Sequence, residues 1–135
     1  MRQFLKRSLA TLAFVGLVAG AVPLSAHHAV QAEFDQTKSA TITGVMKRVM
    51  WVNPHVRWTM EVKNAKTGKL ETWDISGGGP GGFRAIGITG KDVFKVGETY
   101  TAIIALARDG SNYGHVFAFI MPDGRKIDMW QQYAE

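Results

Sequence analysis

The sequence predicts an all-β fold, a small OB-like barrel of five strands. Residues 56–63 alternate apolar and polar side chains, which is typical of a strand with one buried face. Segments rich in β-branched and aromatic residues recur between turn signals along the rest of the chain. Their order is three strands, an irregular or helical connection and two more strands, which is the order of an OB-like barrel. A β-sandwich is the alternative, although a sandwich would use about seven strands.

Local patterns predict the individual elements. Gly44, inside the first strand, predicts a bulge or a sharp bend. Asn53-Pro54 predicts a turn or bulge, because proline cannot donate a hydrogen bond to a neighbouring strand. In the second strand, alternation places Trp58 in the core and Arg57 at the surface. The strands are expected at 41–51, 56–63, 70–75, 99–107 and 115–121, within a domain of roughly 38–130, with a short edge strand after the Pro-Asp-Gly turn.

The connection between the third and fourth strands is rich in glycine. Residues 76–83, "SGGGPGGF", hold five of the 15 glycines in the chain. Such a segment is typical of a flexible connection, and it also allows the backbone to approach a ligand closely. The ten residues that follow, "RAIGITGKDV", are expected to contain at most a short helix.

The first 26 residues have the features of a secretory signal peptide. A basic start, "MRQFLKR", precedes an apolar run and small residues that end at Ala26. A membrane anchor is the alternative, but a spanning helix needs about 20 apolar residues. We therefore expect a signal peptide at 1–26, a single domain at 27–135, and export to the periplasm without stable membrane insertion after cleavage. A second cleavage site, after Ala32, remains open.

Charge and composition narrow the classes of function. Removing the three basic residues of the leader from the 16 in the chain leaves 13 against 11 acidic residues, a net charge near +2. Nucleic-acid binding normally requires clustered Lys and Arg, so no nucleic-acid partner is expected. The chain has no cysteine, so an exported domain must be held together by packing or by a bound ligand. The sequence contains no nucleophile or phosphate-loop motif, so no catalytic residue is predicted and a binding protein is favoured over an enzyme.

The chain has four histidines, and all four are candidate metal ligands. Cleavage after Ala26 would make His27 the first residue, so that its α-amino group and its imidazole could chelate one ion beside His28. Nitrogen ligands of this kind suit Cu(II) best among the first-row divalent ions. Cleavage after Ala32 would remove both histidines. The alternative interpretation of the pair is a solvated terminus.

The other two histidines lie inside the predicted barrel. His55 follows the Asn-Pro turn on the polar side of its strand, where it is either a ligand or a cap of the turn. His115 opens the last core strand in phase with its apolar residues, which is typical of a buried structural histidine and leaves a ligand role open. Glu33 and Asp35 are either solvated charges or oxygen groups that bind the ion or orient an imidazole.

Trp51 and Asn53 are the candidates for binding an organic ligand. Trp51 stands beside the Asn-Pro-His sequence and is the tryptophan best placed to stack on a ligand at the surface. The methionines are scattered along the chain, so we expect them to fill the core rather than to bind copper.

The sequence resembles a family of exported bacterial proteins of unknown function. The resemblance covers essentially the whole mature chain and implies export and a common fold, without an established activity. Its most specific parts are the double histidine after the leader and the Trp-x-Asn-Pro-His sequence. Residues 77–82 depart from the family's pattern. The shared elements are Ala26-His27-His28, Glu33-Phe34-Asp35, Thr43-Gly44, Trp51-Val52-Asn53-Pro54-His55, Trp73, Lys95-Val96-Gly97, Asp109-Gly110-Ser111 and Asp123-Gly124-Arg125-Lys126.

Three functions are consistent with these observations. The first is a periplasmic metal-binding module, with copper as the preferred ion, that acts as a carrier, scavenger or accessory partner of another periplasmic protein. The second is an OB-like module that binds a small ligand, saccharide or protein partner through Trp51, His55 and residues 77–82, without a metal. The third is a small copper-dependent enzyme or accessory subunit, for which the sequence offers no cleft motif.

Overall fold

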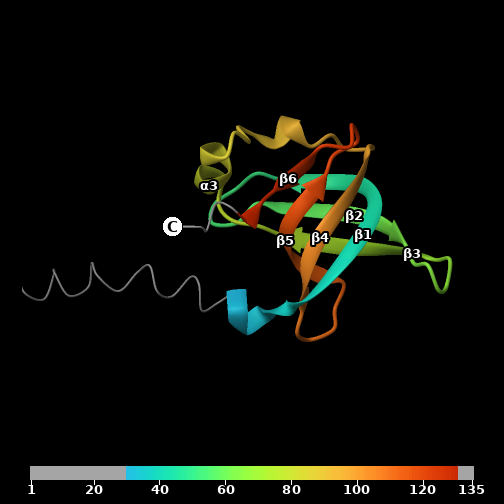
Figure 1. Ribbon diagram of the computed structural model, residues 1–135. Coiled ribbons are helices and arrows are strands. Elements are labelled where there is room, and N and C mark those ends of the chain that lie inside the picture. Colours follow the sequence, from blue (N-terminus) through green and yellow to red (C-terminus); the bar gives the residue numbers. More distant parts are fainter. Residues whose placement is uncertain (1–29, 131–135) are drawn as a thin grey trace, which may run out of the picture. The chain divides into compact units, whose positions relative to one another are not determined.

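The computed structural model describes residues 30–130, and strands form most of this part of the chain (Figure 1). A short helix and a 3-10 turn connect the third and fourth strands. Within residues 30–130, every helix is too short or too polar to cross a bilayer. The elements are β1 (Phe34–Met50), β2 (Arg57–Lys63), β3 (Leu70–Ser76), α3 (Pro80–Ala85), η1 (Lys91–Val93), β4 (Thr99–Ala107), β5 (Tyr113–Ile120) and β6 (Lys126–Asp128).

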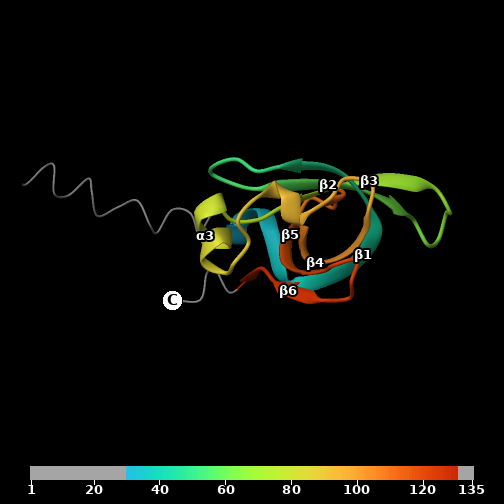
Figure 2. The ribbon, with the colours of Figure 1, turned by 90° about the horizontal axis from the view of Figure 1, so that it is seen from above.

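Five of these strands close into a ring. The sheet order is β3-β2-β1-β4-β5-β6, and β3 also pairs with β5, so the circuit β1-β2-β3-β5-β4 is continuous (Figure 2). Neighbouring strands are antiparallel except for β3 and β5, where Asp74–Ser76 runs parallel to Tyr113–His115. The predicted OB-like barrel is therefore confirmed. The short edge strand β6 pairs with β5 outside the ring.

β1 begins at Phe34 rather than at residue 41 as predicted. It pairs with β4 from Phe34 onward, but the register shifts between Asp35 and Ser39, so that the residues between them bulge out of the ladder. Their polar sequence, "QTK", breaks the apolar alternation that marks a strand. The alternation pattern therefore could not predict that the strand begins before residue 41.

The barrel interior follows the alternation of β2 and the residue before it. Val56, Trp58, Met60 and Val62 are buried, whereas Arg57 is exposed, which confirms the predicted orientation. The Trp58 ring makes edge contacts with the rings of Phe83, Phe94 and Phe119, at centroid distances of 5.7, 5.3 and 5.2 Å. Four methionines are buried in the core, as expected: Met46, Met60, Met121 and Met129.

Part of the glycine-rich connection forms a helix, where the sequence had suggested a flexible link. α3 begins at Pro80, a residue suited to the first helical position because the missing N–H has no partner there. Its Phe83 side chain is fully buried against Trp58. Gly77 makes this packing possible, because a Cβ at that position would lie 2.8 Å from Phe83 Cζ and 2.9 Å from Trp58 Cζ3.

Candidate two-histidine site

The parallel pairing of β3 with β5 brings His115 beside Ser76. The two residues are paired in register, and Ser76 Oγ lies 3.3 Å from His115 Nδ1. Both are buried, with 5% of Ser76 and 1% of His115 exposed. The imidazole also packs against two aromatic rings, those of Phe34 at 5.5 Å and Trp130 at 5.9 Å between centroids. A polar pair therefore lies within apolar surroundings at the closure of the barrel.

His115 does not share the interior face of β5, although the sequence placed it in phase with Phe117 and Phe119. The register with β4 shifts between Val116 and Ala118, so Phe117 is bulged out of the ladder. Val116 and Phe119 belong to the hydrophobic core cluster of the barrel, whereas Phe34, the buried ring that packs against His115, lies outside that cluster. The bulge interrupts the strict alternation of side chains, which is why the phase predicted from sequence does not hold.

The surroundings of His115 keep its imidazole neutral. Burial is the main cause that lowers the pKa of His115 from 6.5 to about 4, and the charge of nearby His55 lowers it further. At neutral pH the ring therefore carries no charge.

His55 is exposed, and a hydrogen bond to Gly77, the residue after Ser76, holds its ring. Its Nδ1 lies 3.0 Å from the backbone oxygen of Gly77. Because a carbonyl oxygen can only accept, Nδ1 must donate and therefore carries the proton. In the neutral ring Nε2 then presents a lone pair, and it has no hydrogen-bond partner among the described residues. Ser76 and Gly77, adjacent on β3 and its extension, thus each hold one of the two imidazoles.

Backbone contacts between the loop that carries His55 and the glycine-rich segment position this histidine. Val56 N donates to Gly78 O and Gly77 N donates to Val56 O, both at 2.9 Å. The Asn53–Pro54 peptide is cis. Pro54 lies against Gly79, where a Cβ would come within 3.0 Å of the Pro54 oxygen. Close approach by the protein's own loop thus accounts for a glycine at this position.

We call His55, Ser76, Gly77 and His115 the two-histidine site. Within residues 30–130, no group of three or more His, Cys, Asp or Glu side chains is arranged to hold a metal ion. This part of the chain therefore supplies at most two imidazoles at the site. The other two predicted ligands, His27 and His28, lie outside the described residues, as does the leader at 1–26.

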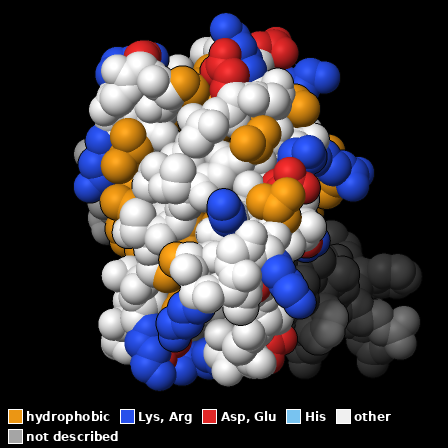
Figure 3. All heavy atoms as spheres, turned by 90° about the vertical axis from the view of Figure 1, so that its right-hand side faces the viewer, with side chains coloured by type: hydrophobic (Ala, Val, Ile, Leu, Met, Phe, Trp, Pro, Cys, Tyr) orange, Lys and Arg blue, Asp and Glu red, His pale blue; other side chains and the backbone are white. Residues whose placement is uncertain are grey.

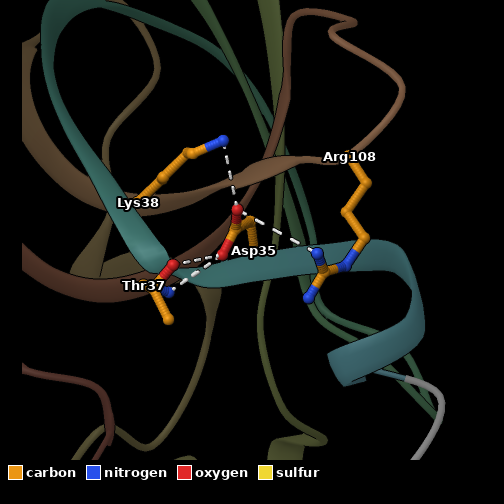
Figure 4. A network of polar contacts seen from close by, with 4 residues as sticks. All are labelled: Asp35, Thr37, Lys38 and Arg108. Atoms are coloured by element: carbon orange, nitrogen blue, oxygen red, sulfur yellow. Dashed lines mark hydrogen bonds and ion pairs between the residues drawn. The ribbon is translucent and has the colours of Figure 1, made fainter.

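Asp35 makes local contacts with Thr37, Lys38 and Arg108 (Figure 4). Its Oδ1 accepts hydrogen bonds from Thr37 N at 3.2 Å and from Thr37 Oγ1 at 2.6 Å. Its Oδ2 lies 3.4 Å from Lys38 Nζ and 4.0 Å from Arg108 Nη1. The hydrogen bond from the Thr37 hydroxyl is the main cause that lowers the pKa of Asp35. Asp35 thus closes the β1 bulge, while the side chain of Glu33 is exposed.

The two residues predicted to bind an organic ligand flank the site. Trp51 is half-buried, and its ring packs on Phe83 of α3 at a centroid distance of 5.6 Å. Asn53 is exposed, and its Oδ1 lies 3.4 Å from the position of a Cβ on Gly79. Trp51 is therefore part of the packing that fixes α3 and the His55 loop.

No sequence pattern identified Ser76 or Gly77 as a hydrogen-bond partner of a histidine, although residues 77–82 were predicted to share a binding surface with His55. The contact of Ser76 with His115 depends on the β3–β5 pairing, which joins residues 39 positions apart. The predicted OB-like topology is the signal that could have found Ser76, because closing the ring of strands requires β3 to meet β5. Gly77 meets His55 instead through the backbone contacts between Val56 and the glycine-rich segment.

Comparisons with known proteins give one family and three chains of solved structures. A model described as "Family of unknown function (DUF6152)" matches residues 13–116. No curated protein matches the sequence. One of the solved structures is that of Rim1, a mitochondrial single-stranded DNA binding protein from S. cerevisiae. Its alignment has a TM-score of 0.47 at 6% sequence identity and covers 67% of this chain and 94% of that chain.

Proposed function

The chain belongs to DUF6152, a family of unknown function, and we propose that it is an exported metal-binding module with copper as its preferred ion. One observation carries the proposal, the hydrogen bond from His55 Nδ1 to Gly77 O at 3.0 Å. It fixes the tautomer and limits rotation of an exposed imidazole, with the Nε2 lone pair available. Metal-binding histidines are commonly oriented by this kind of bond to a backbone carbonyl.

His115 supports the proposal as a second imidazole close to His55. Its lowered pKa keeps it neutral at physiological pH, so it does not repel a cation bound at His55. Because only 1% of its surface is exposed, an ion would reach His115 only if neighbouring side chains moved. His55 is therefore the principal ligand that we propose within the described residues, with His115 as its neighbour.

The remaining ligands in this proposal come from the amino terminus. His27 and His28 are the only other histidines in the chain, and the chain has no cysteine. If the signal peptide is removed after Ala26, the new α-amino group and the His27 imidazole form a chelating pair that the precursor lacks. Nitrogen donors favour Cu(II) over the other divalent first-row ions. Export to the periplasm is part of the proposal, because cleavage creates this pair.

Titration of Cu(II) into the purified mature protein tests the proposal, after intact mass has established where the protein begins. We expect one ion per chain. His55→Ala should weaken binding by about tenfold or more, corresponding to about 1.4 kcal/mol or more. One extra residue before His27 should weaken it as well, because it moves the amine away from the ring. Affinity should fall as pH drops from about 8 to about 6.5, where the α-amine and imidazole take up protons.

A matched control uses Thr59→Ala, which removes a polar side chain from β2 on the same side of the strand as His55 and should leave affinity unchanged. Equal affinity in the native protein and His55→Ala would contradict the role of the described site. A mature protein that begins at Glu33 would contradict the role of His27 and His28.

A further inference from the structure

A groove on the barrel surface opens where β1 and β2 separate. The last pair on this side joins Gly44 to Val62. Beyond it β1 continues along β4, while β2 runs into the hairpin that projects from the barrel in Figure 1. The two backbones approach closely at Gly44, where a Cβ would collide with the Glu61 carbonyl. The groove has a volume of about 510 Å³, and its lining includes Thr41, Thr43, Lys63, Asn64, Glu71 and Trp73.

Trp73 differs from the other three described tryptophans. Trp51, Trp58 and Trp130 each pack against at least one aromatic ring. Trp73 is half-buried at the groove, where part of its ring packs against the hydrophobic core, and it has neither an aromatic ring contact nor a hydrogen bond within the described residues. A large aromatic surface that lines an open groove with no aromatic partner is suited to stacking against a ligand.

The rest of the lining supplies both donors and acceptors. Asn64 Nδ2 donates to Glu71 Oε1 at 2.7 Å, which fixes both side chains at the edge of the groove and leaves the other carboxylate oxygen as an acceptor. The Thr43 hydroxyl is fixed by a hydrogen bond of 2.7 Å to Thr101 Oγ1. Lys63 and Lys66 add exposed donors. The groove therefore combines one aromatic surface with fixed polar groups of both kinds.

We propose that this groove binds a neutral oligosaccharide. A sugar ring presents an apolar C–H face that can stack on an indole, and hydroxyls around its rim require donors and acceptors together. A nucleic acid strand would favour a uniformly basic groove, but Glu71 lies in this one. Figure 3 shows the side from which the hairpin projects, where Lys and Arg are interspersed with Asp and Glu rather than forming one basic surface. The proposal is independent of metal binding at His55.

The test measures binding of neutral hexasaccharides of glucose and of N-acetylglucosamine to the full mature chain, by calorimetry and by tryptophan fluorescence, in the presence of EDTA. At least one sugar should bind, and Trp73→Ala should weaken it by about tenfold or more, as expected for the loss of one stacking contact. Val96→Ala, which truncates an exposed apolar side chain outside the groove and keeps every tryptophan, is the control and should leave sugar affinity unchanged. Glu71→Gln, which keeps the size of the side chain, should also weaken binding and provides a second readout if Trp73→Ala does not fold.

Three results would overturn the proposal. One is the absence of binding by every hexasaccharide at millimolar concentration. Another is sugar binding that Trp73→Ala and Glu71→Gln leave unchanged. The third is binding only of a single-stranded oligothymidylate, which would assign the groove to nucleic acid. Because EDTA removes free metal ions, the outcome is separate from the Cu(II) titration, and either proposal can fail without the other.

Discussion

The barrel interior and the two-histidine site are three residues apart in the chain, at Trp58 and His55, but different interactions hold them. Trp58 is fully buried among aromatic rings, and its indole N–H has no hydrogen-bond partner within the described residues. Burial of apolar surface therefore stabilises the interior even though the Trp58 N–H is left without a hydrogen bond. In the two-histidine site His115 is also buried, but polar contacts orient both imidazoles: Ser76 Oγ lies 3.3 Å from His115 Nδ1, and His55 Nδ1 donates to Gly77 O. The comparison indicates that aromatic packing in the interior contributes most to stability, whereas hydrogen bonds set the orientation of the two imidazoles at the site.

Truncation of Trp58 should give the largest effect. Trp58→Ala removes a ring that contacts three other aromatic rings, so it should lower the free energy of unfolding by about 3–5 kcal/mol. Arg57→Ala, on the exposed face of the same strand, should change it by no more than about 0.5 kcal/mol. Urea denaturation of both variants measures the difference. Equal shifts would show that the interior does not dominate stability.

Acidification should have the second-largest effect on stability, because His115 is protonated more easily in the unfolded chain than in the folded one. Above about pH 6.5 this imidazole is neutral in both the folded and the unfolded chain, so it contributes no pH dependence. Between pH 6.5 and about pH 4, His115 is protonated in the unfolded chain but stays neutral in the folded chain. Stability should therefore fall by about 3 kcal/mol across this range. The lowered carboxyl pKa values of Asp35, Asp109 and Asp123 act below 3.8, outside this window.

The measurement is urea denaturation at a series of pH values, with His115→Gln as the comparison. That variant has no titrating ring at this position, so its stability should change much less between pH 6.5 and pH 4. Parallel curves for the two proteins would show that burial of His115 does not control the acid response.

The sequence predicted the interior better than it predicted the site, and the reason is physical. Alternation along one strand placed Trp58 correctly, because the orientation of neighbouring side chains is a local property of the backbone. The Ser76–His115 contact depends on the parallel pairing of β3 with β5, and the orientation of His115 depends on a bulge at Phe117. The contact of His55 with Gly77 depends on backbone hydrogen bonds between Val56 and the glycine-rich segment. These are contacts between distant segments, which no local pattern encodes. The early start of β1 was missed for the same reason, because pairing with β4 extends the strand through a polar bulge.

Gly77 contacts both the barrel interior and the two-histidine site. A methyl group at this position should have an intermediate effect on the free energy of unfolding. The Cβ of Gly77→Ala would lie 2.8 Å from Phe83 Cζ and 2.9 Å from Trp58 Cζ3, so the rings must shift, at a cost of about 1–3 kcal/mol. Gly81→Ala is the control. Gly81 lies in α3 with no atom within 4 Å of a Cβ, so alanine should stabilise the protein by about 0.5–1 kcal/mol. Opposite signs in thermal unfolding would confirm the packing role of Gly77, and a neutral Gly77→Ala would contradict it.

Removal of the Ser76 hydroxyl should have the smallest effect of the four. Ser76→Ala breaks the 3.3 Å contact with His115 Nδ1, and one neutral hydrogen bond contributes about 0.5–1.5 kcal/mol net. Thr59→Ala is the control, because it removes the hydrogen bond from the Thr59 hydroxyl to Asp74, at 2.8 Å, from an exposed position. Water can replace that partner, so the cost of Thr59→Ala should be the smaller of the two. A loss from Ser76→Ala as large as that from Trp58→Ala would show that the two-histidine site is as important to folding as the interior. A small loss, with His55 still bonded to Gly77, would support a site whose polar contacts orient the imidazoles while the aromatic interior holds the barrel together.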